Sequence, residues 1–285
     1  MIQSMTGFGK HVVQLPSKKI TIEIKSLNSK NLDINTRIPQ LYREKELELR
    51  KMIAESLSRG KVDLGLYVEI TGEETTSEIN QGVVKKYMAQ LGSITEGEPI
   101  KLLELALRMP DTLRSDKDAI DEAEYASIME AMKEALLKIN SFRDKEGSVL
   151  EADFMLRLNS LTQLLEQVKE MDPERLKTIR ERLNRALSEL KVEVDSNRFE
   201  QELIYYLEKY DITEEKVRLA NHLEYFNTTL HSEDSNGKKL GFIAQEIGRE
   251  INTIGSKANY APMQQLVVQM KDELEKIKEQ MLNVL

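Results

Sequence analysis

The spacing of the apolar residues changes once along the chain, and this change limits the folds that the sequence can adopt. In Lys19–Lys25 apolar and polar residues alternate strictly, and Val62–Ile70 repeats the same period of two. This period places every second side chain on one face of a half-buried strand. After Thr71 the strand signals nearly vanish, and apolar residues recur every three or four positions. The sequence therefore predicts an α+β protein whose sheet domain is N-terminal and whose remainder is helical.

Long helices account for most of the chain after the sheet. Hydrophobic residues make up 40% of the sequence and charged residues 32%, with only 6 Phe, 9 Tyr and no Trp, which is typical of a long-helix protein. A first helix is expected over Tyr42–Ser58, ending before Gly60. Three more are expected before the last third of the chain, with short breaks such as Met171-Asp172-Pro173 between them: Asp121–Asn140, Phe142–Lys169 and Glu174–Lys191.

The last third of the chain predicts a helical hairpin or bundle. A helix opens at Asp211, which with Glu214 three residues later has the pattern of a capping box, and runs to about His231. Two further helices follow, separated by a break at residues 259–262. Their apolar stripes fall on one face each: Leu240, Ile243, Ala244, Ile247, Ile251 and Ile254, then Leu266, Met270, Leu274, Ile277, Met281 and Val284.

These patterns divide the chain into three predicted parts. Residues 1–120 form an N-terminal α+β domain, residues 121–200 a long-helix region, and residues 201–285 a C-terminal helical domain. The apolar stripes of the long helices are narrow and their flanks are highly charged, so one chain alone leaves them unsatisfied. We therefore expect a homo-oligomer.

Composition excludes several classes of protein. The chain contains no Cys, which excludes disulfides, thiolate zinc sites, iron–sulfur clusters and cysteine nucleophiles. No signal peptide is evident at the N-terminus, and no apolar run approaches the roughly 20 residues that span a membrane. The chain also lacks a Walker loop, a GxSxG elbow and a Rossmann fingerprint. The sequence predicts a soluble cytoplasmic protein that has no membrane partner.

The charges are distributed unevenly. The net charge is −8, yet residues 1–71 carry +4 and residues 237–285 carry +1, which leaves −13 on residues 72–236. A net negative charge usually argues against nucleic-acid binding, because phosphate contacts dominate such affinity. If the fold brings its two ends together, this protein can still present a basic surface.

The helix that opens at Asp211 carries one candidate site. Glu214, Arg218 and His222 lie at steps of four residues, with Tyr225 close by, on a flank about 100° from the apolar stripe. A carboxylate, a guanidinium and an imidazole on one edge suit an anionic substrate, with His222 as general base or metal ligand. The alternative is an ordinary Glu–Arg pair on a solvated face with an incidental histidine.

The next helix carries a second candidate site. Glu246 and Glu250 lie one turn apart, with Arg249 and Thr253 beside them, and all four are expected to point away from the apolar face. Two carboxylates at this spacing suit a hard cation such as Mg²⁺ or Mn²⁺. The alternative is again an exposed helix face, where Glu-x-x-x-Glu is common. The nearby lysines are either phosphate contacts or solubilising charges: Lys238, Lys239, Lys257 and Lys271.

Motifs over the whole chain resemble the YicC/YloC family. The N-terminal motifs are Met5-Thr6-Gly7-Phe8-Gly9 and Ser26–Asp33. Shorter matches follow at Arg59–Val62, Arg143–Gly147, Asp211–Glu215 and Arg218-x-x-x-His222. The strongest are Gly237–Glu246 and Arg249–Lys257. The chain departs from the family at Gly241, where Asp is usual, at Gly248, where Asn is common, and at Lys278, where Arg is usual.

The resemblance implies a metal-dependent endoribonuclease that cleaves phosphodiester bonds in single-stranded RNA. Members of the family use Mn²⁺ as the usual activator and assemble as homo-hexameric rings. Because most of the candidate residues fall inside these motifs, we predict a role for each. Catalysis falls to His222, Glu246, Arg249 and Glu250, metal binding to Glu214, Glu246 and Glu250 with Mn²⁺ or Mg²⁺, and RNA binding to Arg218, Lys238, Lys239, Asn252, Lys257 and Lys271.

Two other functions stay open from the sequence. One is a non-catalytic, ring-forming protein that binds RNA as an adaptor, and the other is a purely structural helical oligomer. Metal dependence separates the nuclease from the adaptor. Salt-dependent binding of RNA separates the adaptor from the structural oligomer.

Overall fold

The structure is a computed structural model that describes residues 2–71, 78–95, 97–114, 121–189, 196–232 and 237–285. Its contacts divide the chain into two compact units. The sheet unit comprises Phe8–Ser26 and Lys30–Asn140, and the helical unit comprises Met1–Gly7, Leu27–Ser29 and Ser141–Leu285. The predicted division into three parts, with boundaries at residues 120 and 200, stays a prediction.

The sheet unit contains a four-stranded sheet of order β1-β2-β4-β3, with β3 parallel to β4. The two strands predicted from alternation are confirmed as β2 and β4, so the fold is α+β. The other two strands were not predicted, because β1 has glycines at positions 7 and 9 and β3 contains only two apolar residues. The strands are β1 Gly7–Gln14, β2 Lys18–Leu27, β3 Leu32–Arg37 and β4 Gly60–Ile70.

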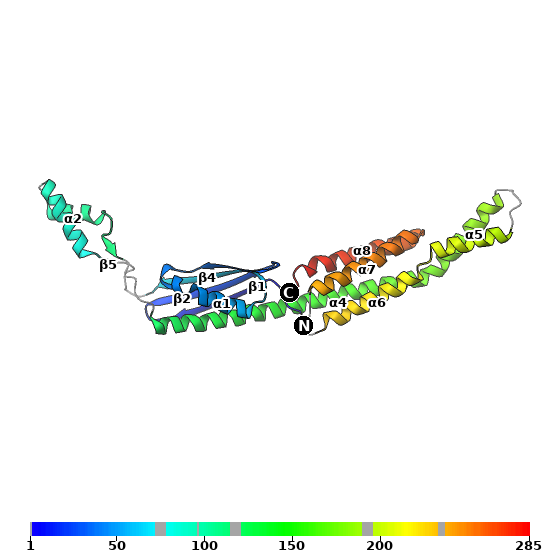
Figure 1. Ribbon diagram of the computed structural model, residues 1–285, viewed down its shortest axis with the longest axis horizontal. Helices are drawn as coiled ribbons and strands as arrows, with labels where there is room; N and C mark the ends of the chain where they lie inside the picture. Colours follow the sequence, from blue (N-terminus) through cyan, green and yellow to red (C-terminus); the bar gives the residue numbers. More distant parts are fainter. Residues whose placement is uncertain (1, 72–77, 96, 115–120, 190–195, 233–236) are drawn as a thin grey trace. The chain divides into compact units, whose positions relative to one another are not determined.

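One face of this sheet is buried under helices. The alternating residues Ile20, Ile22 and Ile24 of β2 and their counterparts on β4 pack in one core with α1 (Glu46–Ser56) and the start of α4 (Figure 1). A 3₁₀ helix, η1 (Gln40–Lys45), precedes α1, so the helix predicted over Tyr42–Ser58 is confirmed in its main part. The residues that alternate with the buried ones point away from the core.

A short helical hairpin interrupts the sheet unit. Two-residue strands β5 (Glu78–Ile79) and β6 (Leu113–Arg114) pair antiparallel, and α2 (Gln81–Ile94) and α3 (Pro99–Leu107) lie between them in sequence. The Asn80 side chain accepts a hydrogen bond from the Val83 amide and caps α2. The sequence did not predict these strands, because two residues are too few to show alternation.

One continuous helix, α4 (Glu122–Glu189), replaces the three long helices predicted from the sequence. The predicted breaks were wrong, including the one at Pro173, which lies inside the helix. Proline removes a single backbone donor, and buried ionic contacts on both sides of it hold the helix together.

Those contacts form a buried charge network around Asp172. The Arg175 guanidinium, which is fully buried, donates to the Asp172 carboxylate at 2.8 Å and to the backbone oxygens of Tyr210 and Lys257 at 2.9 and 3.4 Å. Lys216 Nζ lies 2.6 Å from the other Asp172 oxygen. The network thus joins α4 to the segments around Tyr210 and Lys257.

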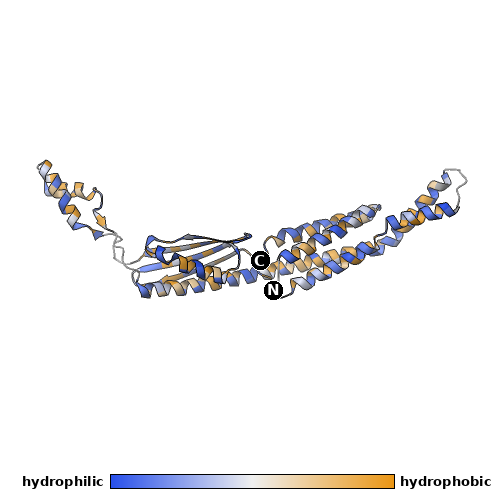
Figure 2. Ribbon diagram, viewed as in Figure 1, coloured by the Kyte–Doolittle hydropathy of each residue, from blue (hydrophilic) through white to orange (hydrophobic). Residues whose placement is uncertain are grey.

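The other helices of the helical unit are α5 (Ser196–Lys209), α6 (Thr213–Leu230), α7 (Gly237–Lys257) and α8 (Ala261–Met281). The last three follow the predicted bounds closely, whereas α5 was not predicted. Apolar residues recur among polar ones along all four helices (Figure 2). The predicted stripes of α7 and α8 are buried in one core. The predicted capping box is wrong. Asp211 Oδ1 accepts from the amide and hydroxyl of Thr213, and Ile212 occupies the N-cap without a side-chain bond.

The first and last residues of the chain meet in the helical unit. Ser4 pairs with Val284, and the Leu285 amide donates to the Gln3 oxygen at 2.9 Å. This N-terminal segment crosses α4 so closely that a Cβ on Gly147 would lie 2.0 Å from the Ile2 oxygen. Within the described residues, no helix combines the length and apolar character needed to cross a membrane.

The Asp172 network predicts a large difference between buried and exposed ion pairs. Asp172→Ala should cost about 3–5 kcal/mol of unfolding free energy, because it leaves Arg175 buried without its carboxylate. Glu166→Ala removes the exposed pair with Lys169 and should cost less than about 1 kcal/mol. Denaturant unfolding of both variants measures the two costs, and equal costs would contradict the account.

Candidate active site

Helices α6 and α7 present two polar flanks to each other. Lys257 Nζ on α7 lies 2.6 Å from Glu215 Oε1 on α6, and Lys239 Nζ lies 5.2 Å from the centre of the Tyr225 ring. Lys239 precedes Lys257 by 18 residues on α7, whereas its partner Tyr225 follows Glu215 by 10 residues on α6. The two helices therefore run antiparallel. Both contacts come from the same flank of each helix.

Helical periodicity then identifies the other residues of these flanks. Steps of three, four and seven residues from the contacting pairs lead along one edge of a helix. We call the two facing edges the α6–α7 seam; it contains Glu215, Arg218, His222, Tyr225 and Thr229 on α6 and Lys239, Glu246, Glu250 and Lys257 on α7. The register brings the Glu246–Glu250 turn level with Arg218 and His222.

Glu250 is the residue whose position differs most from the sequence prediction. It was expected to point away from the apolar face, but it is only 8% exposed. The reason is its spacing, three residues after Ile247 and four before Ile254, both fully buried. Among the residues that the structure describes, no side chain or amide forms a hydrogen bond or ion pair with the Glu250 carboxylate. Its oxygens are not among the fully buried atoms that lack a partner, so they reach the surface at the edge of the core and are open to a ligand.

The seam contains two further buried polar groups that the sequence analysis missed. One oxygen of Glu215 pairs with Lys257, while Oε2 is buried without a hydrogen-bond partner, as is the Thr229 hydroxyl. The sequence does hold a signal for Glu215. It lies four residues before Leu219 and three after Ile212, where an apolar residue would continue the stripe.

The remaining charged groups of the seam are more exposed and mostly paired. Glu246 accepts from Arg249 at 2.7 Å, and Glu214 forms an ion pair with Arg218. His222 is half-buried and has no hydrogen-bond partner within the described ranges. Its ring nitrogens are therefore available to a substrate.

Three residues predicted to bind RNA lie outside the seam. Lys238 and Asn252 are exposed on other sides of α7, and Lys271 is exposed on α8.

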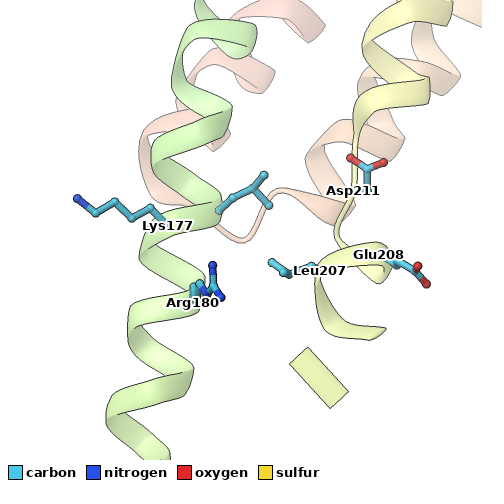
Figure 3. Close-up of a pocket in the computed structure, with 6 residues that line it drawn as sticks. Lys177, Arg180, Leu207, Glu208 and Asp211 are labelled. Atoms are coloured by element: carbon cyan, nitrogen blue, oxygen red, sulfur yellow. The ribbon is translucent and has the colours of Figure 1, made fainter. Parts of the chain in front are cut away.

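A separate pocket of about 440 Å³ lies between α4 and the segment that ends α5. Figure 3 shows Arg180 and Leu207 beside it, and none of its lining residues was predicted as a site residue.

The donors of the seam fit one kind of metal site. In the part of the chain that the structure describes, no three His, Asp or Glu side chains are grouped as a metal cage. Mg²⁺ and similar hard cations do not require one, since they commonly bind one or two carboxylates together with water and substrate phosphates. The unpartnered Glu250 carboxylate, one turn from Glu246, fits a site of this kind.

Comparisons with known proteins identify the family of the chain. A model of the N-terminal region of the YicC-like endoribonucleases matches residues 2–152, and a model of their C-terminal region matches residues 168–285. The chain belongs to the YicC-like endoribonuclease family. It is 32% identical over 293 residues to "Probable endoribonuclease YicC" of Clostridioides difficile and 30% identical over 290 residues to the protein of that name from Haemophilus influenzae. Both matches cover 100% of each chain.

The two glycines of α7 at which this chain departs from the resemblance lie away from the seam. A Cβ on Gly241 would be 3.4 Å from Met281 Cε, and one on Gly248 would be 3.2 Å from Leu274 Cδ2. Both neighbours belong to α8. The absence of Asp at position 241 therefore removes no carboxylate from the α6–α7 seam.

The two glutamates of the seam predict different effects on stability. Glu250→Gln should change the unfolding free energy by less than about 0.5 kcal/mol, because its carboxylate reaches the surface and has no partner to lose. Glu215→Gln should lower it by about 1–2 kcal/mol, because Lys257 loses its charged partner. Thermal unfolding of both variants compares the two costs, and a loss of stability in Glu250→Gln as large as that in Glu215→Gln would show that the Glu250 carboxylate has a stabilising partner.

Proposed function

We propose that this member of the family is a metal-dependent endoribonuclease that cleaves single-stranded RNA at the α6–α7 seam. The observation that carries the proposal is the Glu250 carboxylate, which has no partner among the described residues and lies at the seam, where α6 presents Arg218 and His222 and α7 presents Lys239. A cation supplies the missing partner of Glu250. The cationic side chains suit the phosphates of RNA.

Five residues of the seam, together with Arg249 beside it on α7, have roles in this proposal. Glu246 and Glu250 would hold Mn²⁺ or Mg²⁺, which when bound polarises a phosphoryl oxygen and lowers the pKa of an attacking water or ribose hydroxyl. A free ring nitrogen of His222 would accept the proton of that nucleophile. Arg218, Arg249 and Lys257 would neutralise the phosphate charge that grows in the transition state.

The existing ion pairs do not prevent these roles. Arg218 and Arg249 are 55% and 73% exposed, and exposed pairs contribute little to stability. A phosphate can therefore replace Glu214 or Glu246 as the partner of an arginine. The released carboxylate of Glu246 is then free to bind the cation, and Glu214 lies one turn from Arg218 as a further donor.

Replacing Glu250 tests the proposal directly. Glu250→Gln keeps the size of the side chain but removes the charge that a hard cation requires. We expect metal-dependent cleavage of labelled RNA to fall by orders of magnitude at limiting Mn²⁺, with partial recovery at high Mn²⁺. Reactions in EDTA, Mg²⁺ and Mn²⁺ measure this dependence.

A matched variant separates this effect from a general change of charge. Glu275→Gln removes a carboxylate from an exposed pair with Lys278 on α8 and should cleave RNA at the wild-type rate. If Glu250→Gln also retained the wild-type rate at limiting Mn²⁺, Glu250 would have no metal role. The metal would then be held by other groups, with Glu214, His222 and the last helix as the remaining candidates.

One observation favours the non-catalytic RNA adaptor as a second candidate. The described residues contain no metal cage, and in the structure Glu246 is engaged by Arg249. An adaptor would bind RNA equally well in EDTA and in Mn²⁺ and would leave it intact. The same cleavage assay therefore separates the two functions.

We also propose that the protein is a homo-oligomer, for which the family resemblance implies a hexamer. Large apolar side chains are exposed on several helices, among them Leu137, Val149, Phe242 and Val268, which are 58–67% exposed. Burial of such residues between subunits is favourable. Analytical ultracentrifugation at micromolar concentration should show a species several times the 32.8 kDa chain, and a stable monomer would contradict this.

A further inference from the structure

The open face of the sheet carries two aromatic rings that the proposed cleavage site does not use. This face is formed by the residues that alternate with the buried positions of each strand. It presents Phe8 from β1 and Tyr67 from β4, which are 41% and 47% exposed. It also presents Lys10 and Lys25, and Arg37 at the end of β3. We call these five residues the open sheet face; all of them belong to the sheet unit.

The Tyr67 ring packs over Gly65, where any larger residue would displace it. A Cβ on Gly65 would lie 2.6–2.8 Å from three outer atoms of that ring, so the ring rests over the Gly65 backbone. Lys25 Nζ lies 5.6 Å from the centre of the Phe8 ring, which is a cation–π contact. Both rings thus expose aromatic surface beside a positive charge.

Arg37 is the cation best placed to bind a phosphate. In the parallel pairing of β3 and β4 it lies directly opposite Gly65, next to the Tyr67 ring. A shallow pocket of about 150 Å³ is lined by Arg37, Lys25 and Tyr67 among others. Arg37 is exposed and has no ion pair or hydrogen bond to any residue within the described ranges.

The two carboxylates that line this pocket, Glu23 and Asp63, already have partners, whereas Asp33 on the same face of β3 has none within the described ranges. Glu23 pairs with Lys10 at 2.9 Å and with Lys25 at 3.7 Å, and these lysines lower the pKa of its carboxyl. Asp63 accepts from the Asn35 amide at 3.0 Å. On this face, charged residues of β2 lie between Phe8 on β1 and Tyr67 on β4. This composition is unlike the core of a subunit interface, where charged residues are depleted.

We infer that the open sheet face binds single-stranded RNA, with a base stacked on Tyr67 and a backbone phosphate at Arg37. Exposed bases stack on aromatic side chains of a sheet surface, and flanking cations follow the backbone. The inference rests on the proposed function in taking RNA as the ligand. It assigns the sheet unit a binding role that is separate from cleavage at the seam.

Binding measured without cleavage tests this inference. Fluorescence anisotropy of a short labelled single-stranded RNA in EDTA gives the affinity of the full chain. Tyr67→Leu should weaken binding about tenfold, since the base loses the aromatic ring on which it stacks. Gly65→Ala should also weaken it, because the new methyl group displaces the Tyr67 ring while leaving it in the protein.

Two further variants define what is measured. Tyr205→Leu removes a tyrosine that is 60% exposed on α5 and should bind RNA as the wild type does. Arg37→Gln should reduce the slope of log affinity against log salt concentration by about 1, as expected for one lost phosphate contact. Wild-type affinity in both Tyr67→Leu and Gly65→Ala would overturn the inference.

The assay also separates this inference from the proposed function. If the wild type cleaves RNA in Mn²⁺ but Tyr67→Leu binds RNA normally, the open sheet face is not the binding surface and the seam proposal stands. If Tyr67→Leu loses affinity while the wild type binds RNA without cleaving it, the sheet-face inference holds and the seam proposal fails. If the wild type neither binds nor cleaves RNA, both are wrong.

Discussion

The apolar stripe of α7 is the constraint on which the arrangement of the candidate site depends. Its members, from Leu240 to Ile254, are buried in one core, which fixes the rotation of the helix about its axis. With that rotation fixed, the next flank must face α6, as the contact between Lys257 and Glu215 shows. The position of Glu250 at the edge of the core follows from the same packing. Most of the Glu250 side chain is buried because its neighbours on the helix, Ile247 and Ile254, are fully buried.

The charge network around Asp172 connects this packing to the rest of the helical unit. Arg175 donates to the backbone oxygen of Lys257, whose side chain pairs with Glu215. The end of α7 is thus held from α4 by a group that is itself completely buried. Strong buried pairs of this kind lose much stability when one member is removed, so they keep one arrangement of the helices. The α7 end of the seam is therefore tied to α4 by buried contacts.

Sequence reasoning predicted the helices of the site but not the state of their side chains. The stripes of α7 and α8 have a strong period, so their bounds and buried faces could be predicted from the sequence. The continuity of α4 through Pro173 could not, because it depends on Tyr210 and Lys257, which are distant in sequence. The burial of Glu250 could have been predicted, since it occupies a stripe position between Ile247 and Ile254. Its lack of a partner could not, because that depends on what α6 presents opposite it.

Crystals of the full chain soaked in Mn²⁺ would test the central claim most directly. Anomalous diffraction locates manganese without reference to activity. The account predicts a peak at the α6–α7 seam within bonding distance of a Glu250 oxygen, about 2.0–2.6 Å by analogy with other hard cations. The peak should be absent from crystals of Glu250→Gln soaked in the same way. Manganese bound elsewhere, with the Glu250 carboxylate unoccupied in a protein that cleaves RNA in Mn²⁺, would contradict it.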